Sequence, residues 1–600
     1  MRRRPPECLF GLSEYPTFTM AFRSQLHVKP STLLLCLLAV SGALTACGGG
    51  GEVDDTVVAE SSTSTPAAST EDSAEALIST STPSTDTEVA DGSASNADMA
   101  PNLPEETILP PEAQDTETMA TAQANSTANC SIIPAIPAVP SGAKLVTAFG
   151  AKPNDTTDDT AAIQKALDGM KSGEWLVFPS GKYLINKSIK LKVANTTMYG
   201  AGATIHATNP TDQAIWIQAD GVRVYSFTKT AVTTTRQTTP WSAGMTIYAS
   251  NADGSRKAVN NVVIQGNKII NAGTPGTNLA NSAGSAGIII LKGYRFLVAN
   301  NTVQRSLADA IHITSGSRDG RVIGNTVREN GDDMVAVVSY AAGGSGALGS
   351  GSKTYSDWSN KQSSGINKNM YIANNDLAGQ YWGRGITMIG ADGVTVRNNK
   401  VHNSPMGAGI LLAREASYQT FGTRNILIDG NTIDQTQTMN PPYNPGNKFT
   451  TSKITGHGAI EIHSVIFKDE AAIAQLSTDL SVRNVAMINN KITEVDAPGM
   501  RIGQASGSSV SAVDPATGKT VTRTTQAGRI ENLGLEKTAM SGVHHSVPMS
   551  ISTTNVQTTS TWCSGNTNSG SGITSGACKM TAKPAVTGAT LSCTSTGQTG

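Results

Sequence analysis

The sequence predicts an all-β fold, a right-handed parallel β-helix with a short capping helix at its N-terminal end, preceded by a disordered tether. Composition and two repeated sequence motifs support this prediction. The 600 residues include 59 Gly but only 10 Phe, and 15% are charged, which suits short strands broken by turns rather than amphipathic helices. This length exceeds one ordinary globular core, whereas in a repeat body each unit needs only its neighbours.

The first repeated motif is a strand followed by a corner that contains Asn. It begins at residues 261–269, where Val262-Val263-Ile264 is followed by Gly266-Asn267, and its copies lie at residues 297–303, 322–327, 394–401, 426–433 and 485–492. Asn tolerates a left-handed backbone and can bond to its copy one coil away, while the flanking apolar residues alternate into the core. We therefore expect a row of stacked asparagines along one corner.

The second repeated motif, apolar–x–apolar after a small residue, marks another face of each coil. Its copies lie at residues 287–290, 310–313, 334–337, 385–388, 409–412, 459–462 and 499–502. Equivalent positions are 24 residues apart from 311 to 335 and from 386 to 410, but 51 apart from 335 to 386 and 50 apart from 410 to 460. The two long intervals predict surface loops over residues 340–366 and 436–455, which would wall a groove on one flank.

The N-terminus carries the pattern of an export signal. Arg23 and Lys29 precede an apolar run over residues 33–40 that is too short to span a bilayer, and Leu44-Thr45-Ala46-Cys47 follows. The tetrapeptide resembles a bacterial lipobox, with Met20 as a candidate true start. This resemblance implies that Cys47 is the lipidated first residue of a lipoprotein in the bacterial cell envelope, and Gly48 after it implies the outer membrane.

The remaining chain divides into a tether, a folded body and a C-terminal region. Residues 48–128 are rich in Ser, Thr, Ala, Pro and acidic residues and predict a disordered tether. Residues 129–540 hold the β-helix, and residues 541–600 form a region rich in Ser, Thr and Gly. Four cysteines, Cys130, Cys563, Cys578 and Cys593, predict two disulfides of undefined pairing, and a zinc site is the competing interpretation.

The folded body opens with a short helix and two strands. Asp158 or Asp159 is placed to cap a helix over residues 161–167, and residues 175–185 read as a strand, a Pro-Gly turn and a second strand. This stretch resembles the opening of the pectate-lyase-like superfamily, which includes the polygalacturonases. The resemblance implies that the helix covers the open end of a β-helix and that both carboxylates are structural.

Charged residues precede the second repeated motif in consecutive coils. Alignment of the copies places Asp309, Asp333 and Arg384 in one row, with Asp332 directly before Asp333. Neighbouring coils of a parallel sheet lie about 4.8 Å apart, so we expect these charges to converge on one outward edge. Adjacent carboxylates raise each other's proton affinity, so one serves as a general acid while an ionised partner activates water.

The same residues resemble the active-site pattern of polygalacturonases, which carry Asn-Thr-Asp, then Asp-Asp, Gly-His-Gly and Arg-Ile-Lys. Here Ala308-Asp309-Ala310 is followed one coil later by Gly331-Asp332-Asp333, which implies that these aspartates are the acid and base of a polysaccharide hydrolase. Gly383-Arg384-Gly385 replaces the expected histidine, and Gly456-His457-Gly458 lies two coils later. Arg-Ile-Lys has no copy in register, and Arg414 is the nearest basic residue.

The departures from this pattern leave other reactions open. In a polysaccharide lyase, carboxylates hold Ca²⁺ beside a uronate and Arg384 removes the α-proton. In a non-catalytic protein for polysaccharide binding or exopolysaccharide export, the aspartates only cap turns and Arg384 only pairs with Asp333. An epimerase is a further option without a distinctive motif. No metal is assigned beyond the Ca²⁺ of the lyase hypothesis.

Several other side chains are candidates for contact with a glycan. His312 is expected to point outward beside Asp309, and Tyr381 and Trp382 are placed to stack on sugar rings. Arg414 and His457 are further candidates for substrate binding. Glu461 and His463 share a face with His457, at a spacing that disfavours zinc, and Glu415 is interpreted as an ordinary surface partner of Arg414.

The overall charge restricts the partners. The formal net charge is -1 at pH 7, so no global field recruits nucleic acid, and attraction to an acidic ligand must be local. The expected partners are a polysaccharide and, through the lipid on Cys47, a membrane. The oligomeric state is left open.

Overall fold

The computed structural model describes residues 129–232, 239–252, 256–270, 286–340, 365–380, 383–405, 407–416, 418, 420–438, 457–468, 480–503, 509–513 and 520–594. The predicted signal, Cys47 and the predicted tether lie outside these residues. Most of both predicted loops, residues 341–364 and 439–456, also lies outside them. Within the described part of the chain, no helix is long and apolar enough to cross a membrane.

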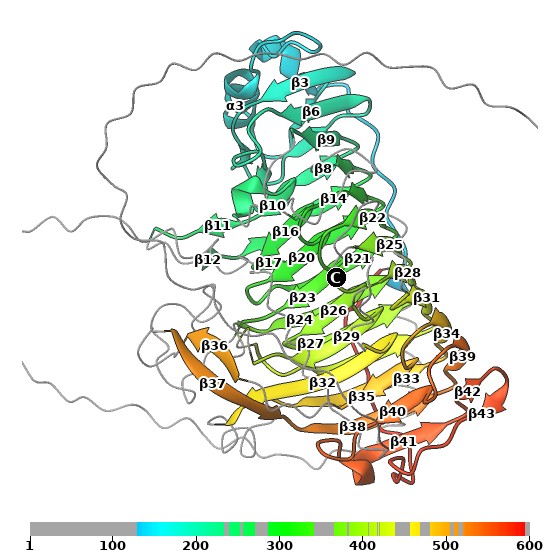
Figure 1. Cartoon of the computed structure of the whole chain (residues 1–600). Coiled ribbons are helices and arrows are strands. Elements are labelled where there is room, and N and C mark those ends of the chain that lie inside the picture. The colour runs from blue at the N-terminus through cyan, green and yellow to red at the C-terminus, as the bar shows by residue number, and fades with distance from the viewer. Residues whose placement is uncertain are drawn as a thin grey trace, which may run out of the picture. The chain divides into compact units, whose positions relative to one another are not determined.

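Three parallel sheets wind around one axis, which confirms the predicted right-handed parallel β-helix (Figure 1). Most coils contribute one strand to each sheet, and consecutive coils pair in register. We name the sheets A, B and C. Sheet A contains β1 (Lys144–Leu145), β2 (Trp175–Val177), β5 (Thr197–Tyr199), β8 (Arg223–Tyr225), β13 (Val259–Asn260), β14 (Val263–Gln265), β17 (Gly293–Tyr294), β18 (Leu297–Ala299), β21 (Arg318–Ile323), β24 (Asn367–Ala373), β27 (Ala391–Arg397), β30 (Arg424–Asp429), β33 (Val482–Ile488), β38 (Ile530–Glu536) and β41 (Thr561–Ser564).

Sheets B and C complete the coils. Sheet B contains β3 (Gly181–Ile185), β6 (Ala203–Ala207), β9 (Thr228–Ala231), β15 (Lys268–Ile270), β19 (Thr302–Gln304), β22 (Thr326–Asn330), β25 (Asp376–Gln380), β28 (Lys400–Ser404), β31 (Thr432–Thr436), β34 (Lys491–Val495), β39 (Ala539–Val543), β42 (Thr567–Asn568) and β43 (Ser571–Gly572). Sheet C contains β4 (Ile189–Leu191), β7 (Ile215–Ile217), β10 (Met245–Ile247), β16 (Ile288–Leu291), β20 (Ile311–Thr314), β23 (Val335–Val338), β26 (Ile386–Ile389), β29 (Ile410–Arg414), β32 (Ile460–Phe467), β35 (Met500–Ile502) and β40 (Met549–Ile551).

Short elements decorate the coils. An antiparallel hairpin of β36 (Ser509–Val513) and β37 (Thr520–Ala527) pairs with the end of β32, and β11 (Ala249–Ser250) pairs with β12 (Arg256–Lys257). Short 3₁₀ turns lie at residues 146–149, 240–242 and 558–560.

Alternate side chains of most strands in the coils fill one continuous core. In β20, for example, Ile311 and Ile313 are fully buried in this core, whereas His312 between them faces outward. Two-residue periodicity sends every second side chain of a strand inside. The residues at these inward positions are almost entirely Ile, Val, Leu and Met. Outward positions are therefore not needed for the core and are available for other uses.

A row of asparagines stabilises one corner, as predicted. In Asn267, Asn301, Asn325, Asn375, Asn399, Asn431 and Asn490, each side-chain amide donates to the side-chain oxygen of the next, at 2.9–3.1 Å. The left-handed backbone falls on the residue before the ladder, such as Gly266 with φ 70° and Asn300 with φ 52°. Two adjacent positions thus share the two roles that the sequence assigned to Asn alone.

Helix α3 (Thr160–Asp168) covers the N-terminal coil, as predicted. The two neighbouring aspartates differ in function. Asp158 accepts the backbone N–H of Thr160 at the start of the helix. Asp159 makes no capping bond; it is buried and accepts the N–H groups of Lys152 and Leu184, which fastens the helix to β3. Both carboxylates are structural.

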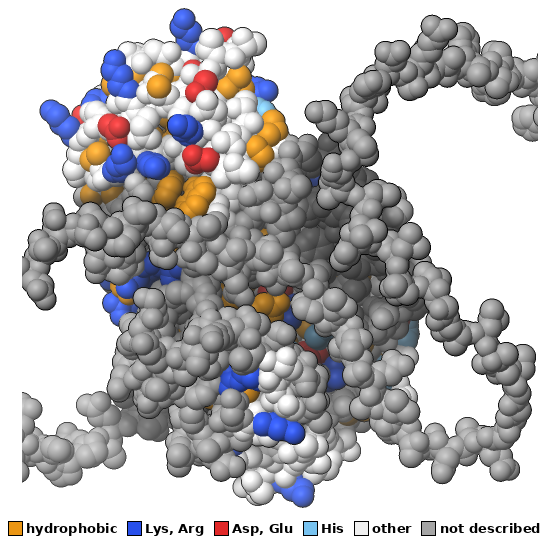
Figure 2. Space-filling model, turned by 60° about the vertical axis from the view of Figure 1, so that its left-hand side comes forward, with side chains coloured by type: hydrophobic (Ala, Val, Ile, Leu, Met, Phe, Trp, Pro, Cys, Tyr) orange, Lys and Arg blue, Asp and Glu red, His pale blue; other side chains and the backbone are white. Residues whose placement is uncertain are grey.

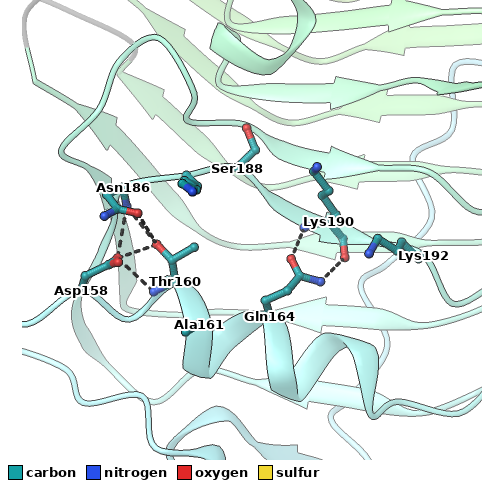
Figure 3. Close-up of a pocket in the computed structure, with 9 residues that line it drawn as sticks. Asp158, Thr160, Ala161, Gln164, Asn186, Ser188, Lys190 and Lys192 are labelled. Carbon is teal, nitrogen blue, oxygen red and sulfur yellow. Dashed lines mark hydrogen bonds between the residues drawn. The ribbon is translucent and has the colours of Figure 1, made fainter. Parts of the chain in front are cut away.

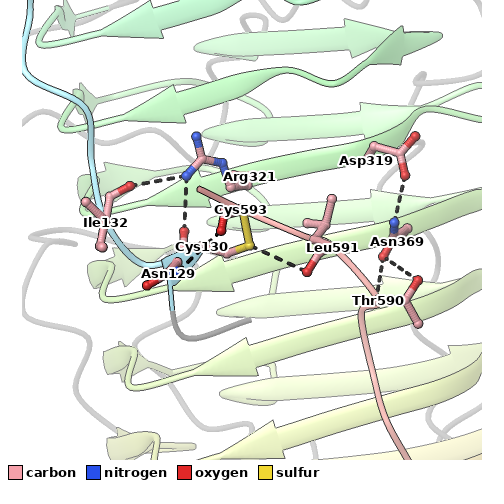
Figure 4. Close-up of a disulfide and its surroundings, with 9 residues drawn as sticks. All are labelled: Asn129, Cys130, Ile132, Asp319, Arg321, Asn369, Thr590, Leu591 and Cys593. Atoms are coloured by element: carbon pink, nitrogen blue, oxygen red, sulfur yellow. Dashed lines mark hydrogen bonds between the residues drawn. A yellow bond between two sulfur atoms is a disulfide. The ribbon is translucent and has the colours of Figure 1, made fainter. Parts of the chain in front are cut away.

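Two disulfides join the four body cysteines, Cys130–Cys593 and Cys563–Cys578. The first joins the two ends of the described chain on the outer face of sheet A (Figure 4). Arg321 of β21 donates to the carbonyls of Cys130 and Ile132, and Asn369 of β24 accepts the N–H of Thr590. We call residues 129–137 the N-terminal strap and residues 584–593 the C-terminal strap.

The coil stack extends beyond the predicted boundary at residue 540. This residue lies inside β39, and the next strands continue the parallel register of sheets A, B and C. The low content of large apolar residues after 540 concealed these last coils, because their strands are only two to four residues long.

Candidate functional site

The predicted row of charges forms on the outer edge of sheet C. Val335 of β23 pairs with Ile311 of β20 on one side and with Ile386 of β26 on the other. The residues two positions before these, Asp309, Asp333 and Arg384, therefore stack on three consecutive coils. We call Asp309, Asp332 and Asp333 the aspartate cluster.

Each buried aspartate of the cluster uses one oxygen to hold the next coil. Asp309 Oδ1 accepts the backbone N–H of Asp333 at 2.9 Å, and Asp333 Oδ1 accepts that of Arg384 at 2.7 Å. The turn-capping role that the sequence left open therefore exists, but it engages only one oxygen of each carboxyl group. Asp309 Oδ2 lies 2.6 Å from Nδ1 of His312, so His312 lies beside Asp309 as expected and also bonds to it.

Burial favours the protonated forms of Asp309 and Asp333. Burial raises the pKa of Asp309 to about 6, although its bond to His312 acts to lower it. Burial also raises the pKa of Asp333 to about 7; Arg384 acts to lower it, and Asp332 acts to raise it. Asp332 itself is more exposed. Near neutral pH the site thus holds a buried acid beside a solvent-accessible carboxyl group.

Arg384 connects this cluster to a second group of charges. Its guanidinium lies 3.9 Å from Asp333 Oδ1 and donates to Glu415 Oε1 at 3.0 Å. Burial acts to lower the pKa of Arg384, but Glu415, Asp333 and Asp332 together raise it above its ordinary value. A guanidinium held charged in this way is a poor proton acceptor, which argues against Arg384 as the base of a lyase.

The interpretation of Glu415 as a surface partner of Arg414 is wrong. Glu415 is buried and lies between Arg384 and His463, whose Nε2 is 3.7 Å from Glu415 Oε1. Burial acts to raise the pKa of Glu415, but Arg384 and His463 lower it overall. Arg414 is fully buried and donates to the carbonyl of Val465 at 2.7 Å, so it is badly placed for the predicted contact with a substrate.

Two histidines share a carboxylate at the far end of the row. Glu461 Oε2 accepts from His457 Nδ1, and Glu461 Oε1 pairs with His463 Nδ1, both at 2.9 Å. Burial acts to raise the pKa of Glu461, but the two histidines bring it well below its ordinary value. Burial by itself lowers the pKa of His463, whereas Glu415 and Glu461 raise it overall to about 9. We call these three residues the histidine–glutamate cluster.

Small and amide side chains keep the turns of the aspartate cluster close together. A side chain at Gly383 would collide with the backbone and carboxylate of Asp332. Asn330 donates to the carbonyls of Asp332 and Asp333 at 2.6 and 3.0 Å, and Gln380 donates to the carbonyl of Gly383. Neither amide was predicted, although each ends a sheet B strand just before the charged residue of its coil.

The aspartate cluster has the composition of a site for a hard divalent cation. One oxygen from each of its three carboxyl groups lies within 4.8 Å of the others, and it is the only such group of metal-ligating side chains among the described residues. Carboxylates suit Ca²⁺. His312, Arg384 and two backbone N–H groups already engage several of these oxygens. Tyr381 and Trp382, predicted to stack on sugars, lie outside the described residues.

The body resembles a known family of carbohydrate-active β-helices. Residues 145–438, just under half of the chain, match the model of the family described as rhamnogalacturonase A/epimerase, pectate lyase-like. The body is thus similar to the superfamily that the sequence motifs suggested. Comparison with curated protein sequences gave no match.

Several solved structures are similar to this chain at low identity. The A-module of mannuronan C-5 epimerase AlgE6 from Azotobacter vinelandii is 14% identical, with a TM-score of 0.44, over 71% of this chain and 99% of that one. The GH87 α-1,3-glucanase catalytic unit from Streptomyces thermodiastaticus is 18% identical, with a TM-score of 0.43, over 73% and 71%. A family 28 exopolygalacturonase from Yersinia enterocolitica is 14% identical, with a TM-score of 0.32, over 60% and 75%.

Proposed function

We propose that this protein hydrolyses glycosidic bonds of an acidic or otherwise complex polysaccharide that lies along the outer face of sheet C. The observation that carries the proposal is the aspartate cluster, in which burial raises the pKa of Asp333 to about 7 beside the more exposed Asp332. A general acid works best when its pKa lies near the operating pH. Paired carboxyl groups with different environments are the standard equipment of glycoside hydrolysis.

The roles follow from exposure and contacts. Asp333 donates its proton to the glycosidic oxygen, and Asp332 accepts a proton from the attacking water. Asp309, held by His312, keeps the backbone N–H of Asp333 in place. Arg384 provides a fixed positive charge beside Asp333 as that residue becomes negative.

The test is the mass and absorbance of the product. The purified protein is incubated with a panel of uronate-containing and neutral polysaccharides, and products are analysed by mass spectrometry. Hydrolysis adds one water per cleavage and gives no new ultraviolet absorbance. Absence of any product from every glycan, with glycan binding retained in Asp309→Asn and Asp333→Asn, would instead support a binding or export protein.

β-Elimination is the second candidate, and the histidine–glutamate cluster is the observation that favours it. Glu461 holds Nδ1 of His457, so Nε2 of this partly exposed imidazole is directed away from the carboxylate. His457 therefore suits the role of base better than Arg384 does. An unsaturated, ultraviolet-absorbing product that disappears with chelator, and that Glu461→Gln lowers more than Asp333→Asn does, would favour this reaction with Ca²⁺ in the aspartate cluster.

We also propose that Cys47 carries a lipid that anchors the protein to the bacterial outer membrane. The lipobox-like tetrapeptide supports this proposal. Metabolic labelling with a radioactive fatty acid should mark the wild-type chain and not Cys47→Ser. Labelling of neither chain, with both recovered in the soluble fraction, would contradict it.

A further inference from the structure

A group of lysines and aromatic rings occupies the N-terminal end of the same face that carries the aspartate cluster. The outward residues of sheet C align in register from Lys190 through Trp216, Thr246 and Ile289 to His312. Four coil steps of about 4.8 Å separate Lys190 from His312, a distance of about 19 Å along the axis. One extended polymer can therefore contact both places.

The aromatic rings are held in a fixed arrangement. Trp216 donates its indole N–H to the carbonyl of Tyr248 at 2.8 Å, and its ring stacks on Trp241 with centroids 6.1 Å apart. Lys190 Nζ lies 4.9 Å from the centre of the Trp216 ring, within the range of a cation–π interaction. Trp216 and Trp241 are only half-buried, so they add an apolar surface beside a fixed positive charge.

A pocket of about 510 Å³ opens beside these rings, between α3 and the residues around β4 (Figure 3). Its lining includes Gln164, Asn186, Lys187, Ser188, Lys190 and Lys192. Gln164 bridges from α3 to the backbone N–H and carbonyl of Lys190, at 2.8 and 3.0 Å, which fixes the strand that carries this lysine. Ser188 donates to the carbonyl of Trp241 and so connects the pocket with the rings.

The charge of the pocket is positive. Three lysines line it against a single acidic residue, Asp158, whose carboxylate already accepts bonds from Thr160 and Asn186. Asp168 lies 3.8 Å from Lys192 outside the lining. Figure 2 shows that basic side chains outnumber acidic ones on this face of the N-terminal coils. The protein as a whole has a net charge of only -1, so this patch is a local feature.

We propose that the pocket and the tryptophans form a second binding site for a negatively charged sugar of the polysaccharide that reaches the aspartate cluster. This proposal rests on the proposed function in one respect, namely that the ligand is a polysaccharide. Lysines would pair with carboxylate or sulfate groups while a tryptophan ring contacts the apolar face of the sugar. The site would strengthen the binding of long chains. It would not change the affinity for short fragments that contact only the aspartate cluster.

The test compares two triple variants in an Asp333→Asn background, which separates binding from cleavage. The site variant replaces Lys187, Lys190 and Lys192 with Gln. The control replaces Lys268, Lys400 and Lys491 with Gln; these exposed lysines stand on sheet B and remove the same charge. Polygalacturonate, dextran sulfate and neutral dextran are the probes, and affinity is measured at low and high salt, with thermal unfolding to confirm that each variant folds.

The site variant should bind at least one acidic probe about tenfold more weakly at low salt, because three partly exposed ion pairs are lost. The control variant should bind as the parent does, and high salt should remove the difference. Preference between the two acidic probes identifies carboxylate or sulfate as the bound group. Trp241→Ala should also weaken binding, whereas Trp175→Ala, which removes a half-buried ring from sheet A, should not.

Three results would overturn the proposal. They are equal losses in the two triple variants, equal affinity of the parent for neutral dextran, and binding to anionic phospholipid vesicles through these lysines with none to either acidic polymer. Failure of the proposed function gives a different result. In that case the wild-type protein releases no product from any glycan, yet the site variant still loses affinity for an acidic chain.

Discussion

The outer faces of sheets A and C are built on the same coils but are used in opposite ways. On sheet A, outward residues such as Leu297, Ile323 and Tyr371 are apolar and pack under the straps with Leu591 and the Cys130–Cys593 disulfide. On sheet C, the outward side of the same stack carries the aspartate cluster and the histidine–glutamate cluster, linked by Arg384 and Glu415. Both inner faces are rows of Ile, Val, Leu and Met.

This difference shows how a solenoid separates folding from chemistry. The inner rows and the asparagine ladder define the coil, so an outward position is available either for further burial or for charge. Buried charges are costly unless they are paired, and on sheet C they are paired along the row from Asp309 to Glu461. Changes on sheet C should therefore affect activity, whereas changes on sheet A should affect stability.

The largest expected effect is that of Asp333→Asn on catalysis. Loss of the general acid should lower kcat by about a thousandfold, the middle of the range for such groups, without lowering the unfolding temperature. Asp376, on the outer face of sheet B, accepts a bond from Arg328 at 2.8 Å. Asp376→Asn is the matched control and should retain activity in the same assay. If Asp333→Asn instead loses activity only because a matching fraction of the protein is unfolded, the carboxyl group serves only as a cap.

Removal of the disulfide on sheet A should produce the reverse result. The Cys130–Cys593 bond closes a loop of 463 residues, and disulfides in large loops contribute up to about 5 kcal/mol. Cys130→Ser with Cys593→Ser should lower the free energy of unfolding by about 3–5 kcal/mol, measured by urea denaturation, and leave kcat/KM unchanged. The Cys563→Ser, Cys578→Ser pair, which opens a loop of only 15 residues, should cost less.

The pH dependence of activity follows from the raised pKa of Asp333. The proposed acid is protonated in the folded state below a pKa of about 7, so kcat/KM should fall as pH rises through about 7. Initial rates measured from pH 4 to pH 9 would show this alkaline limb. A rate that instead rises through pH 7 would favour a base as the group that limits the reaction, and thus the lyase.

The smallest effect concerns an irregular position in the inner row. Lys229 of β9 is fully buried among apolar residues, its Nζ bonds to Gln213 at 2.9 Å, and burial lowers its pKa to about 7. A lysine whose pKa is lower in the folded than in the unfolded state reduces stability below the unfolded pKa, and this cost is largest below pH 7. Lys229→Met should therefore raise the free energy of unfolding by about 2 kcal/mol at pH 6.

That advantage should shrink as pH rises above 7, because the folded lysine is then neutral and the unfolded lysine loses its charge only near its ordinary pKa of about 10.4. Chemical denaturation at pH 6, 8 and 10 measures this trend. Lys268→Met, on the exposed side of sheet B, is the control and should show no comparable dependence. A constant difference between Lys229→Met and wild type at all three values would mean that packing, and not charge, governs this position.

The coils and the aspartate cluster could be predicted because both follow from local periodicity. The repeat of Val335 with Ile311 and Ile386 gives the register, and register alone brings Asp309, Asp333 and Arg384 together. Asn330 and Gln380 could have been found from the same register, since both end strands of sheet B one turn before the charged residues. They were missed because a buried amide looks like any other polar turn residue.

Glu415 and the disulfide pairing could not be predicted from periodicity. Strand β29 ends at Arg414, and the chain beyond it is irregular, so no repeat indicates that Glu415 turns toward Arg384 rather than toward its neighbour in sequence. The partner of Cys130 depends on the path of two straps that belong to no coil. Such contacts are set by tertiary packing over 463 residues.

The Cys130–Cys593 bond also determines how the body would carry mechanical load. Residue 129 enters beside β21, in the middle of the stack, and not at the capped end near α3. If Cys47 carries the proposed lipid, tension from the anchor would pass partly through this covalent bond into the C-terminal strap, which lies against β24 and β27. A polysaccharide held at the aspartate cluster would pull on the same middle coils, so the load would cross only a short part of the stack.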